Sequence, residues 1–251
     1  MHVLGVRDAG ADDDTLEAVV DRLVDRLADR GRVGVVRYDA TIADGTHARE
    51  SSTFDEGITT VGGDVTYDLG VDGDWTASGT GLSVGDALDR LATDCEYAVV
   101  VGVSALQYPS VVVGSPGAAD ADDDPIATVD GPGDLEFEPL VATLESAQPH
   151  ETLESLVARI KRSPRADRAG AIATFTGRVR AKDSADDVPT QYLEFEKYEG
   201  VADERMAALE ADLEARDGVL DVELYHRTGI VEAGDDIVFV VVLAGHREEA
   251  F

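Results

Sequence analysis

The stretch Gly170–Arg180 reads GAIATFTGRVR, a short apolar run followed directly by two arginines. Isoleucine, threonine and phenylalanine in close succession are typical of a β-strand. Arg178 and Arg180 are two residues apart, so on an extended backbone their side chains project to the same side. The stretch therefore predicts a strand over Gly170–Val179 that presents a pair of cations at its end.

A second strand of the same kind is predicted near the end of the printed sequence. Gly234-Asp235 is typical of a turn, and residues 237–243 read IVFVVVL, a continuous apolar run of the kind found in buried strands. His246 and Arg247 follow just past this run. We expect these two strand ends to meet and form a small, positively charged pocket.

The charge balance is extreme, with 21 Lys and Arg against 52 Asp and Glu and a formal net charge of −31. Such a polyanion should repel nucleic acid and anionic membrane surfaces, so neither is expected as a partner. Because 43% of the residues are hydrophobic, disorder does not explain the charge. We interpret it as the solvated surface of a halophilic protein, adapted to high salt.

The remaining composition limits the chemistry and the location of the protein. Cys95 is the single cysteine, which excludes an internal disulfide and a cysteine-held metal. The first residues lack a signal-peptide pattern, and no apolar run reaches the roughly 18 residues of a membrane span. We therefore expect a cytoplasmic protein with no metal and no cofactor.

The first part of the chain predicts an α/β domain with a parallel sheet. It opens strand–helix–strand, with apolar runs at Val3–Val6 and Val33–Tyr38 and a helix that Thr15 would cap. Residues 41–80 are rich in Gly, Asp and Thr and predict loops and hairpins. Further elements are predicted for a helix at Ser83–Leu91 and for strands at Tyr97–Val103, Ser110–Val113 and Ile126–Val129.

A boundary is expected at residues 146–150, which read SAQPH and divide the chain into domains 1–147 and 148–251. The second domain predicts strands and helices without regular alternation, which is typical of an α+β fold. Its expected helices are Thr152–Lys161 and Ala202–Arg216, the latter with Met206, Leu209 and Leu213 facing inward, and its expected strands are Gly170–Val179, Tyr192–Tyr198, Val219–Tyr225 and Ile237–Leu243.

Residues 150–251 resemble the large, catalytic subunit of molybdopterin synthase, the MoaE family. The resemblance rests on four ordered blocks: GAIATFTGRVR from residue 170, LEFEKYEG from 193, HRTG from 226, and GDDIVF from 234 with HREEAF from 246. It implies sulfur transfer from a thiocarboxylated, small ubiquitin-like subunit to a cyclic pyranopterin monophosphate. A homodimer core is implied as well.

The resemblance also implies roles for individual residues. Arg180 would hold the anionic substrate or the carrier tail, His246 would exchange protons, and Arg247 would bind phosphate. Phe175 would form a pocket wall, and Arg178 would be a secondary cation. His246, Arg247 and Arg180 are thus the catalytic candidates, whereas His226-Arg227 is interpreted as structural.

One part of the family pattern has no counterpart in the printed sequence. In the family, the histidine–arginine motif leads into a helix and loop with two catalytic lysines, and Phe251 stands where that helix would begin. Lys161, Lys182 and Lys197 do not occupy the family positions. We therefore expect the sequence to be a fragment of a longer protein, with activity as given in doubt.

Residues 1–145 resemble a degenerate form of the MobB family, a nucleotide-binding P-loop fold of molybdenum cofactor assembly. A working phosphate loop has Gly-Lys-Thr/Ser before the first helix, where this chain has Asp12-Asp13-Asp14-Thr15. Aspartates there repel a triphosphate. Two alternatives to the enzyme remain: a non-catalytic adaptor that binds the sulfur carrier or molybdenum cofactor enzymes, and a GTP-binding assembly protein.

Overall fold

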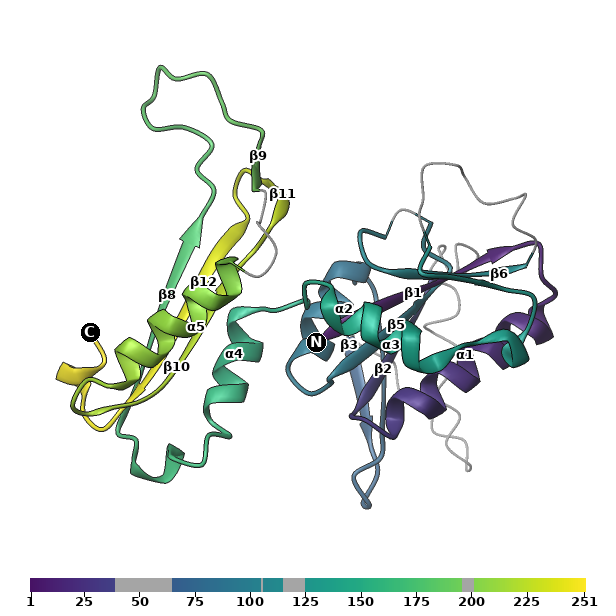
Figure 1. The fold of residues 1–251 in the computed structure, drawn as a ribbon, viewed down its shortest axis with the longest axis horizontal. Coiled ribbons are helices and arrows are strands. Elements are labelled where there is room, and N and C mark those ends of the chain that lie inside the picture. The colour runs from purple at the N-terminus through teal and green to yellow at the C-terminus, as the bar shows by residue number, and fades with distance from the viewer. Residues whose placement is uncertain (39–64, 105, 115–124, 196–200) are drawn as a thin grey trace. The chain divides into compact units, whose positions relative to one another are not determined.

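The computed structural model describes residues 1–38, 65–104, 106–114, 125–195 and 201–251. The chain divides into two compact units, residues 1–91 with 95–147 and residues 92–94 with 148–251 (Figure 1). Predictions for residues 41–64, for Lys197 and for the last part of the strand expected over Tyr192–Tyr198 fall outside the described residues.

The first unit is built on a sheet of five strands in the order β2-β5-β1-β6-β7. Every pairing within it is parallel, so the α/β parallel sheet predicted from the sequence is confirmed. All residues of β5 are buried, as its apolar sequence predicted. The strands are β1 (His2–Ala9), β2 (Val33–Arg37), β5 (Tyr97–Val101), β6 (Ser110–Gly114) and β7 (Ala127–Val129).

Two helices of this unit, α1 (Asp13–Ala28) and α3 (Phe137–Ser146), share one core with the sheet. Leu23 of α1 and Leu144 of α3 are both buried in that core. The sequence did not predict α3. A third helix, α2 (Val84–Ala92), packs Leu91 close to the backbone of β2 at Gly34, and a short 3-10 helix η4 covers Pro132–Asp134.

A two-stranded antiparallel hairpin, β3 (Val65–Leu69) and β4 (Trp75–Gly79), completes the first unit. The hairpin agrees with the turn-rich sequence of this region. Tyr67 and Trp75 are exposed on it, with ring centroids 6.3 Å apart.

The second unit contains a three-stranded sheet of order β10-β12-β8, antiparallel throughout. Its strands are β8 (Ala171–Arg178), β10 (Val219–His226) and β12 (Asp236–Ala244). A smaller antiparallel pair is formed by β9 (Tyr192–Phe195) and β11 (Gly229–Glu232). The α+β class predicted for this part is therefore confirmed.

The helices of the second unit contact the larger sheet in different ways. On α4 (Leu153–Ile160), apolar residues pack against buried residues of β12 such as Val241. By contrast, α5 (Val201–Glu214) lies along β10 (Figure 1), where Glu210 accepts a hydrogen bond from the Leu224 N–H at 3.0 Å. The expectation that Leu209 faces inward is wrong, because this side chain is 50% exposed.

Candidate functional site

Three segments of the second unit meet at one end of its larger sheet: the residues before β8, those before β10 and those after β12. Ala171 and Val219 both pair with Ala244, the last residue of β12. The Gly170 N–H donates to the Ala244 carbonyl at 3.0 Å, and the Gly245 N–H donates to the Gly218 carbonyl at 2.9 Å. Backbone hydrogen bonds therefore hold the three segments together.

A pocket of about 440 Å³, open to solvent, lies among these segments. His246 lines it, together with Arg168 of the 3-10 helix η5 (Ala166–Arg168) and Arg216, which follows α5. Asp217 and Glu249 lie in the same wall. Two arginines and a histidine thus line one small pocket in a chain whose net charge is −31.

The position of His246 is fixed by a turn that follows β12. Here the 3-10 helix η6 (Arg247–Glu249) brings the Glu249 carboxylate back to accept the His246 N–H at 2.9 Å. Gly218, with a φ of +83°, lies directly against that carboxylate. Because a Cβ at Gly218 would overlap Glu249, the close approach needs glycine there.

Arg178 and Arg180 lie at the other end of the sheet. Arg178 ends β8 opposite Asp236, with its Nε 3.1 Å from the Asp236 Oδ1, and its guanidinium also donates to the Gly234 carbonyl. Arg180 is exposed and forms an ion pair with Asp183 at 3.0 Å. These two arginines form a second cationic group.

The expected meeting of the two strand ends does not occur within one chain. Because β8 and β12 are antiparallel, the end of β8 lies beside the start of β12, away from His246. At roughly 3.3 Å per residue, Arg180 is about 30 Å from the end where His246 lies. Spacing along the sequence does not reveal the relative direction of two strands, so a pocket shared by Arg180 and His246 stays a prediction for two chains.

The strand β8 has one free edge within the described residues, since β12 is the strand that pairs with it there. Phe175, predicted as a pocket wall, is 61% exposed on this strand. Ile172 is also exposed. An eight-residue edge strand with exposed apolar side chains is a surface that natural proteins normally cover.

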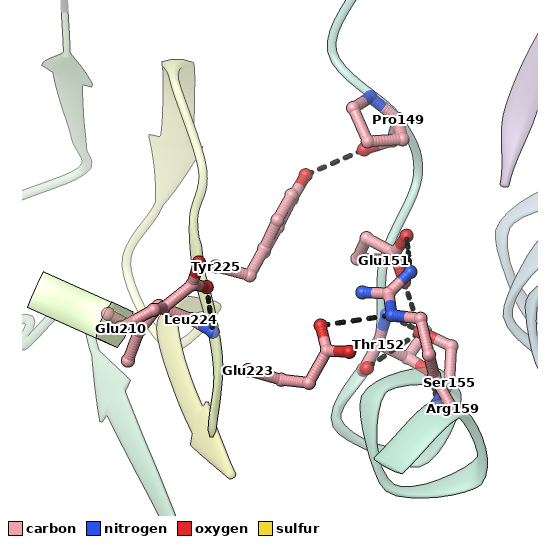
Figure 2. A network of polar contacts seen from close by, with 9 residues as sticks. All are labelled: Pro149, Glu151, Thr152, Ser155, Arg159, Glu210, Glu223, Leu224 and Tyr225. Carbon is pink, nitrogen blue, oxygen red and sulfur yellow. Dashed lines mark hydrogen bonds and ion pairs between the residues drawn. The ribbon is translucent and has the colours of Figure 1, made fainter. Parts of the chain in front are cut away.

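A network of polar residues, of which Glu151, Thr152 and Ser155 are buried, joins α4 to β10 (Figure 2). The guanidinium of Arg159 lies between two carboxylates, with 3.0 Å to Glu151 and 3.0 Å to Glu223. Ser155 donates to Glu151 at 2.5 Å, and the Tyr225 hydroxyl donates to the Pro149 carbonyl at 2.7 Å. The network fixes the entry to α4 against the sheet.

The pKa values of the two carboxyl groups in this network, Glu151 and Glu223, are shifted in opposite directions. Burial acts to raise the pKa of Glu151, but its charged and hydrogen-bonding neighbours, among them Ser155 and Arg159, outweigh burial and hold the pKa below its ordinary value. Burial raises the pKa of Glu223, with Arg159 opposing the shift and Glu210 adding to it. Arg159 lowers the pKa of both groups, whereas the hydrogen bond from Ser155 acts on Glu151 and the like charge of Glu210 acts on Glu223.

The loop between β1 and α1, where a P-loop would bind phosphate, is filled by carboxylates of the chain itself. Asp8 accepts the N–H groups of Gly10 and Ala11 at 2.9 and 2.8 Å. Asp12, rather than the predicted Thr15, caps α1 and accepts the Thr15 N–H at 2.8 Å. The pKa of Asp12 is lowered, chiefly by the hydrogen bond from the Thr15 backbone. The backbone amides of Gly10, Ala11 and Thr15 therefore already donate hydrogen bonds to carboxylates of the chain itself.

Within the described ranges, no three His, Cys, Asp or Glu side chains are grouped so that they could ligate a metal ion. In the same part of the chain, every helix is too short or too polar to cross a lipid bilayer.

Arg168 and Arg216 were not among the residues predicted for the site. The strand pairing, and not a motif, indicates them: each lies three residues before a strand whose first residue pairs with Ala244. Only the register of β8 and β10 on β12 shows that they reach His246.

A family model described as "MoaE protein" matches residues 146–251. A protein of Haloferax volcanii described as "probable molybdopterin synthase" is 45% identical over 251 residues, which is 100% of this chain and 88% of that protein. The "molybdopterin synthase catalytic subunit" of Caulobacter vibrioides is 38% identical over 85 residues, 34% of this chain and 54% of the subunit. The chain thus spans about half the length of this bacterial relative.

Two groups of solved structures are similar to the two parts of the chain. The molybdopterin cofactor biosynthesis protein E of Burkholderia multivorans is 32% identical with a TM-score of 0.34, covering 41% of this chain and 64% of that one. The MobB structure of Bacillus subtilis is 13% identical with a TM-score of 0.40, covering 60% of this chain and 100% of that one.

Proposed function

The chain belongs to the MoaE family of molybdopterin synthase, and we propose that it transfers sulfur from a thiocarboxylated small subunit to a cyclic pyranopterin monophosphate. In each transfer the thiocarboxylate sulfur bonds to a carbon of the pterin side chain and an oxygen substituent leaves that carbon, which gives a thioester between carrier and pterin. Water then hydrolyses the thioester, which restores the carrier carboxylate and leaves the sulfur on the pterin as a thiol. Two carriers are therefore consumed for each dithiolene.

The observation that supports this proposal best is the separation of two cationic groups by one strand with a free edge. Sulfur transfer between two anions needs cations for both the phosphate and the thiocarboxylate, and it needs a group that exchanges protons. One end of the larger sheet supplies His246, with Arg247 next to it, and the other supplies Arg178 and Arg180. Two chains together hold a complete set at each site.

A two-fold pairing of β8 with β8 of a second copy joins these groups. In an antiparallel pair centred on Thr174, Arg180 of one copy lies opposite Arg168 of the other, about 5 Å away across the strands. Arg168 lies two residues before Gly170, which is hydrogen-bonded to the end of β12. The same pairing covers the exposed edge and partly buries Phe175.

In this arrangement each residue has a defined task. Arg180 binds the carrier thiocarboxylate, and its present partner, Asp183, is an exposed surface residue that a ligand can displace. His246 gives and takes the proton as oxygen leaves and sulfur adds. Arg247 adds positive charge beside it.

The test is a reaction with the thiocarboxylated small subunit and the cyclic pterin monophosphate, in which the dithiolene product is measured. We expect product from the protein, a loss of at least about 100-fold in rate for His246→Ala and Arg180→Ala, and an unchanged rate for Arg162→Ala. Arg162 is exposed and lies outside the pocket lining, so it is the matched control.

The same reaction separates the enzyme from its alternative. If the carrier binds the protein and the two substitutions leave that binding intact, but no dithiolene forms, the protein is an adaptor and the proposal is wrong.

A further inference from the structure

The pocket beside His246 has two arginines that neither the family motif nor the comparisons assign. We propose that Arg168 and Arg216 bind the phosphate group of the pterin substrate, with His246 at the edge of that subsite. This inference rests on the proposed function and deepens it, because it says where the phosphate lies and which residues hold it.

The backbone fixes the origin of both side chains. Arg168 ends η5, three residues before β8 begins, and Arg216 lies three residues before β10 begins. The hydrogen bonds of Gly170 to Ala244 and of Gly245 to Gly218 hold both segments beside the end of β12. Two guanidinium groups that start from fixed positions on either side of one pocket suit a tetrahedral anion, which accepts hydrogen bonds from several directions.

The charges around the pocket leave these two arginines available. Arg165, in the same segment as Arg168, is already paired with Glu214 at 2.9 Å and lies 3.8 Å from Asp221. In the described part of the chain, neither Arg168 nor Arg216 has a carboxylate oxygen within 4.0 Å, although the chain carries 52 acidic residues. A guanidinium pair without a carboxylate partner in such an acidic protein favours an anionic ligand from solution.

The two carboxylates of the lining narrow the ligand class further. Glu249 is held by the His246 N–H, and Asp217 is exposed at the rim. A phosphate group leaves these carboxylates without a partner, whereas a pterin also carries an aminopyrimidinone edge with N–H donors that carboxylates accept. The volume of about 440 Å³ lies within the range for small-molecule sites. A pterin monophosphate satisfies both kinds of group.

The experiment measures binding without the carrier and without turnover. The probes are 6-hydroxymethylpterin monophosphate and its dephosphorylated form, with binding followed by pterin fluorescence. We expect the protein to bind the phosphorylated probe at least about 10-fold more tightly than the dephosphorylated one. The dephosphorylated probe cannot form the charge-assisted hydrogen bonds between a phosphate and the two arginines. The double variant Arg168→Ala/Arg216→Ala should bind both probes equally.

Matched variants and a competitor complete the test. Arg162→Ala should keep the preference for phosphate, and Arg168→Lys/Arg216→Lys should keep part of it. Inorganic phosphate should compete with the phosphorylated probe in the unaltered protein and not in the double alanine variant. All variants are first shown to unfold at the temperature of the unaltered protein.

The inference is overturned if the protein does not distinguish the two probes, or if the double alanine variant still does. These outcomes are independent of the proposed function. A protein that makes dithiolene with an unchanged KM for the pterin in the double variant would keep sulfur transfer and lose the phosphate subsite. A protein that prefers the phosphorylated probe and makes no dithiolene would keep the subsite and lose sulfur transfer.

Discussion

At the scale of single residues, Glu151 shows how a strongly acidic chain uses a carboxylate inside the fold as well as on its surface. It is 3% exposed, accepts a hydrogen bond from Ser155 and pairs with Arg159. An ionised carboxylate tolerates such burial only when its partners replace the lost water. Ser155 and Arg159 supply such partners to Glu151.

The first prediction concerns Glu151→Gln and its dependence on pH. Because the pKa of Glu151 is lower in the folded than in the unfolded state, its ionised form stabilises the fold above the ordinary value of 4.5, and this contribution is lost as the pH falls through the lowered folded value. The variant should lose about 1–3 kcal/mol at pH 7. The difference from the unaltered protein should shrink as the pH falls below that ordinary value.

Chemical denaturation at several pH values measures this difference. Glu154→Gln, an exposed carboxylate in the first turn of the same helix, is the control and should give a small difference at every pH. If the free energy of unfolding depends on pH in the same way for the unaltered protein and for Glu151→Gln, the ionised Glu151 carboxylate does not stabilise the fold.

At the scale of elements, α5 protects the edge of β10 through carboxylates. Glu210 accepts the Leu224 N–H, and Glu214 accepts the Val222 N–H at 3.3 Å and also pairs with Arg165. These hydrogen bonds occupy N–H groups at the edge of β10 that could otherwise pair with a strand of another molecule. The position of α5 therefore depends on two acidic side chains and less on an apolar stripe.

We predict that Glu210→Ala lowers the stability of the second unit by about 1 kcal/mol, the usual cost of leaving a strand N–H without its acceptor. Hydrogen exchange at the Leu224 amide should accelerate more than elsewhere in β10. Glu204→Ala, an exposed change on the same helix, should leave that amide unaffected. Unchanged protection at Leu224 in Glu210→Ala would show that the hydrogen bond does not hold α5 in place.

The elements that the sequence predicted best are those with a continuous apolar pattern. The run from Ile237 to Leu243 predicted β12, and the resemblance of residues 150–251 to the MoaE family is confirmed by the match over 146–251. The helix α3 was missed because Pro139 lies in its first turn, where proline is tolerated but reads as a breaker.

The inward face of α5 and the geometry of the site could not be predicted for physical reasons. Hydrophobic spacing cannot reveal a helix that is held by Glu210 and Glu214 on a strand edge. Likewise, motifs that follow two strands predict one pocket only if the strands run in the same direction, and β8 and β12 do not. Arg168 and Arg216 enter the site through strand register, which a single sequence does not show.

The free edge of β8 makes a specific prediction for cross-linking. In a protein with Cys95→Ser, Thr174→Cys should form a covalent dimer under mild oxidation. Thr174 lies on the proposed two-fold axis, so this residue of one copy lies opposite the same residue of the other. Leu209→Cys, at an exposed position on α5, should stay monomeric on a denaturing gel. Equal cross-linking of the two variants, or none of Thr174→Cys, would rule out the β8 pairing.

At the scale of the whole molecule, the net charge of −31 sets the conditions under which the fold is stable. Mutual repulsion of carboxylates falls as the Debye length shortens from about 10 Å at 0.1 M salt to about 3 Å at 1 M. We expect the unfolding temperature to rise by on the order of 10 °C between 0.1 and 2 M KCl. Asp21→Asn/Asp25→Asn, two exposed changes on α1, should reduce the salt requirement, and an unfolding temperature independent of KCl would contradict this account.

The last prediction tests whether the active site belongs to two chains. If Arg180 acts across the β8 pairing on the pocket of its partner, then Arg180→Ala and His246→Ala damage different halves of each site. Co-expression of the two inactive variants should place both changes in one site of each mixed dimer and leave the other site intact. Since half of randomly assembled dimers are mixed, the preparation should recover about a quarter of the unaltered activity. Two changes in the same half, His246→Ala with Arg168→Ala, should recover none. Failure of the first pair to recover activity, with dimers present in equal amount, would mean that each chain works alone.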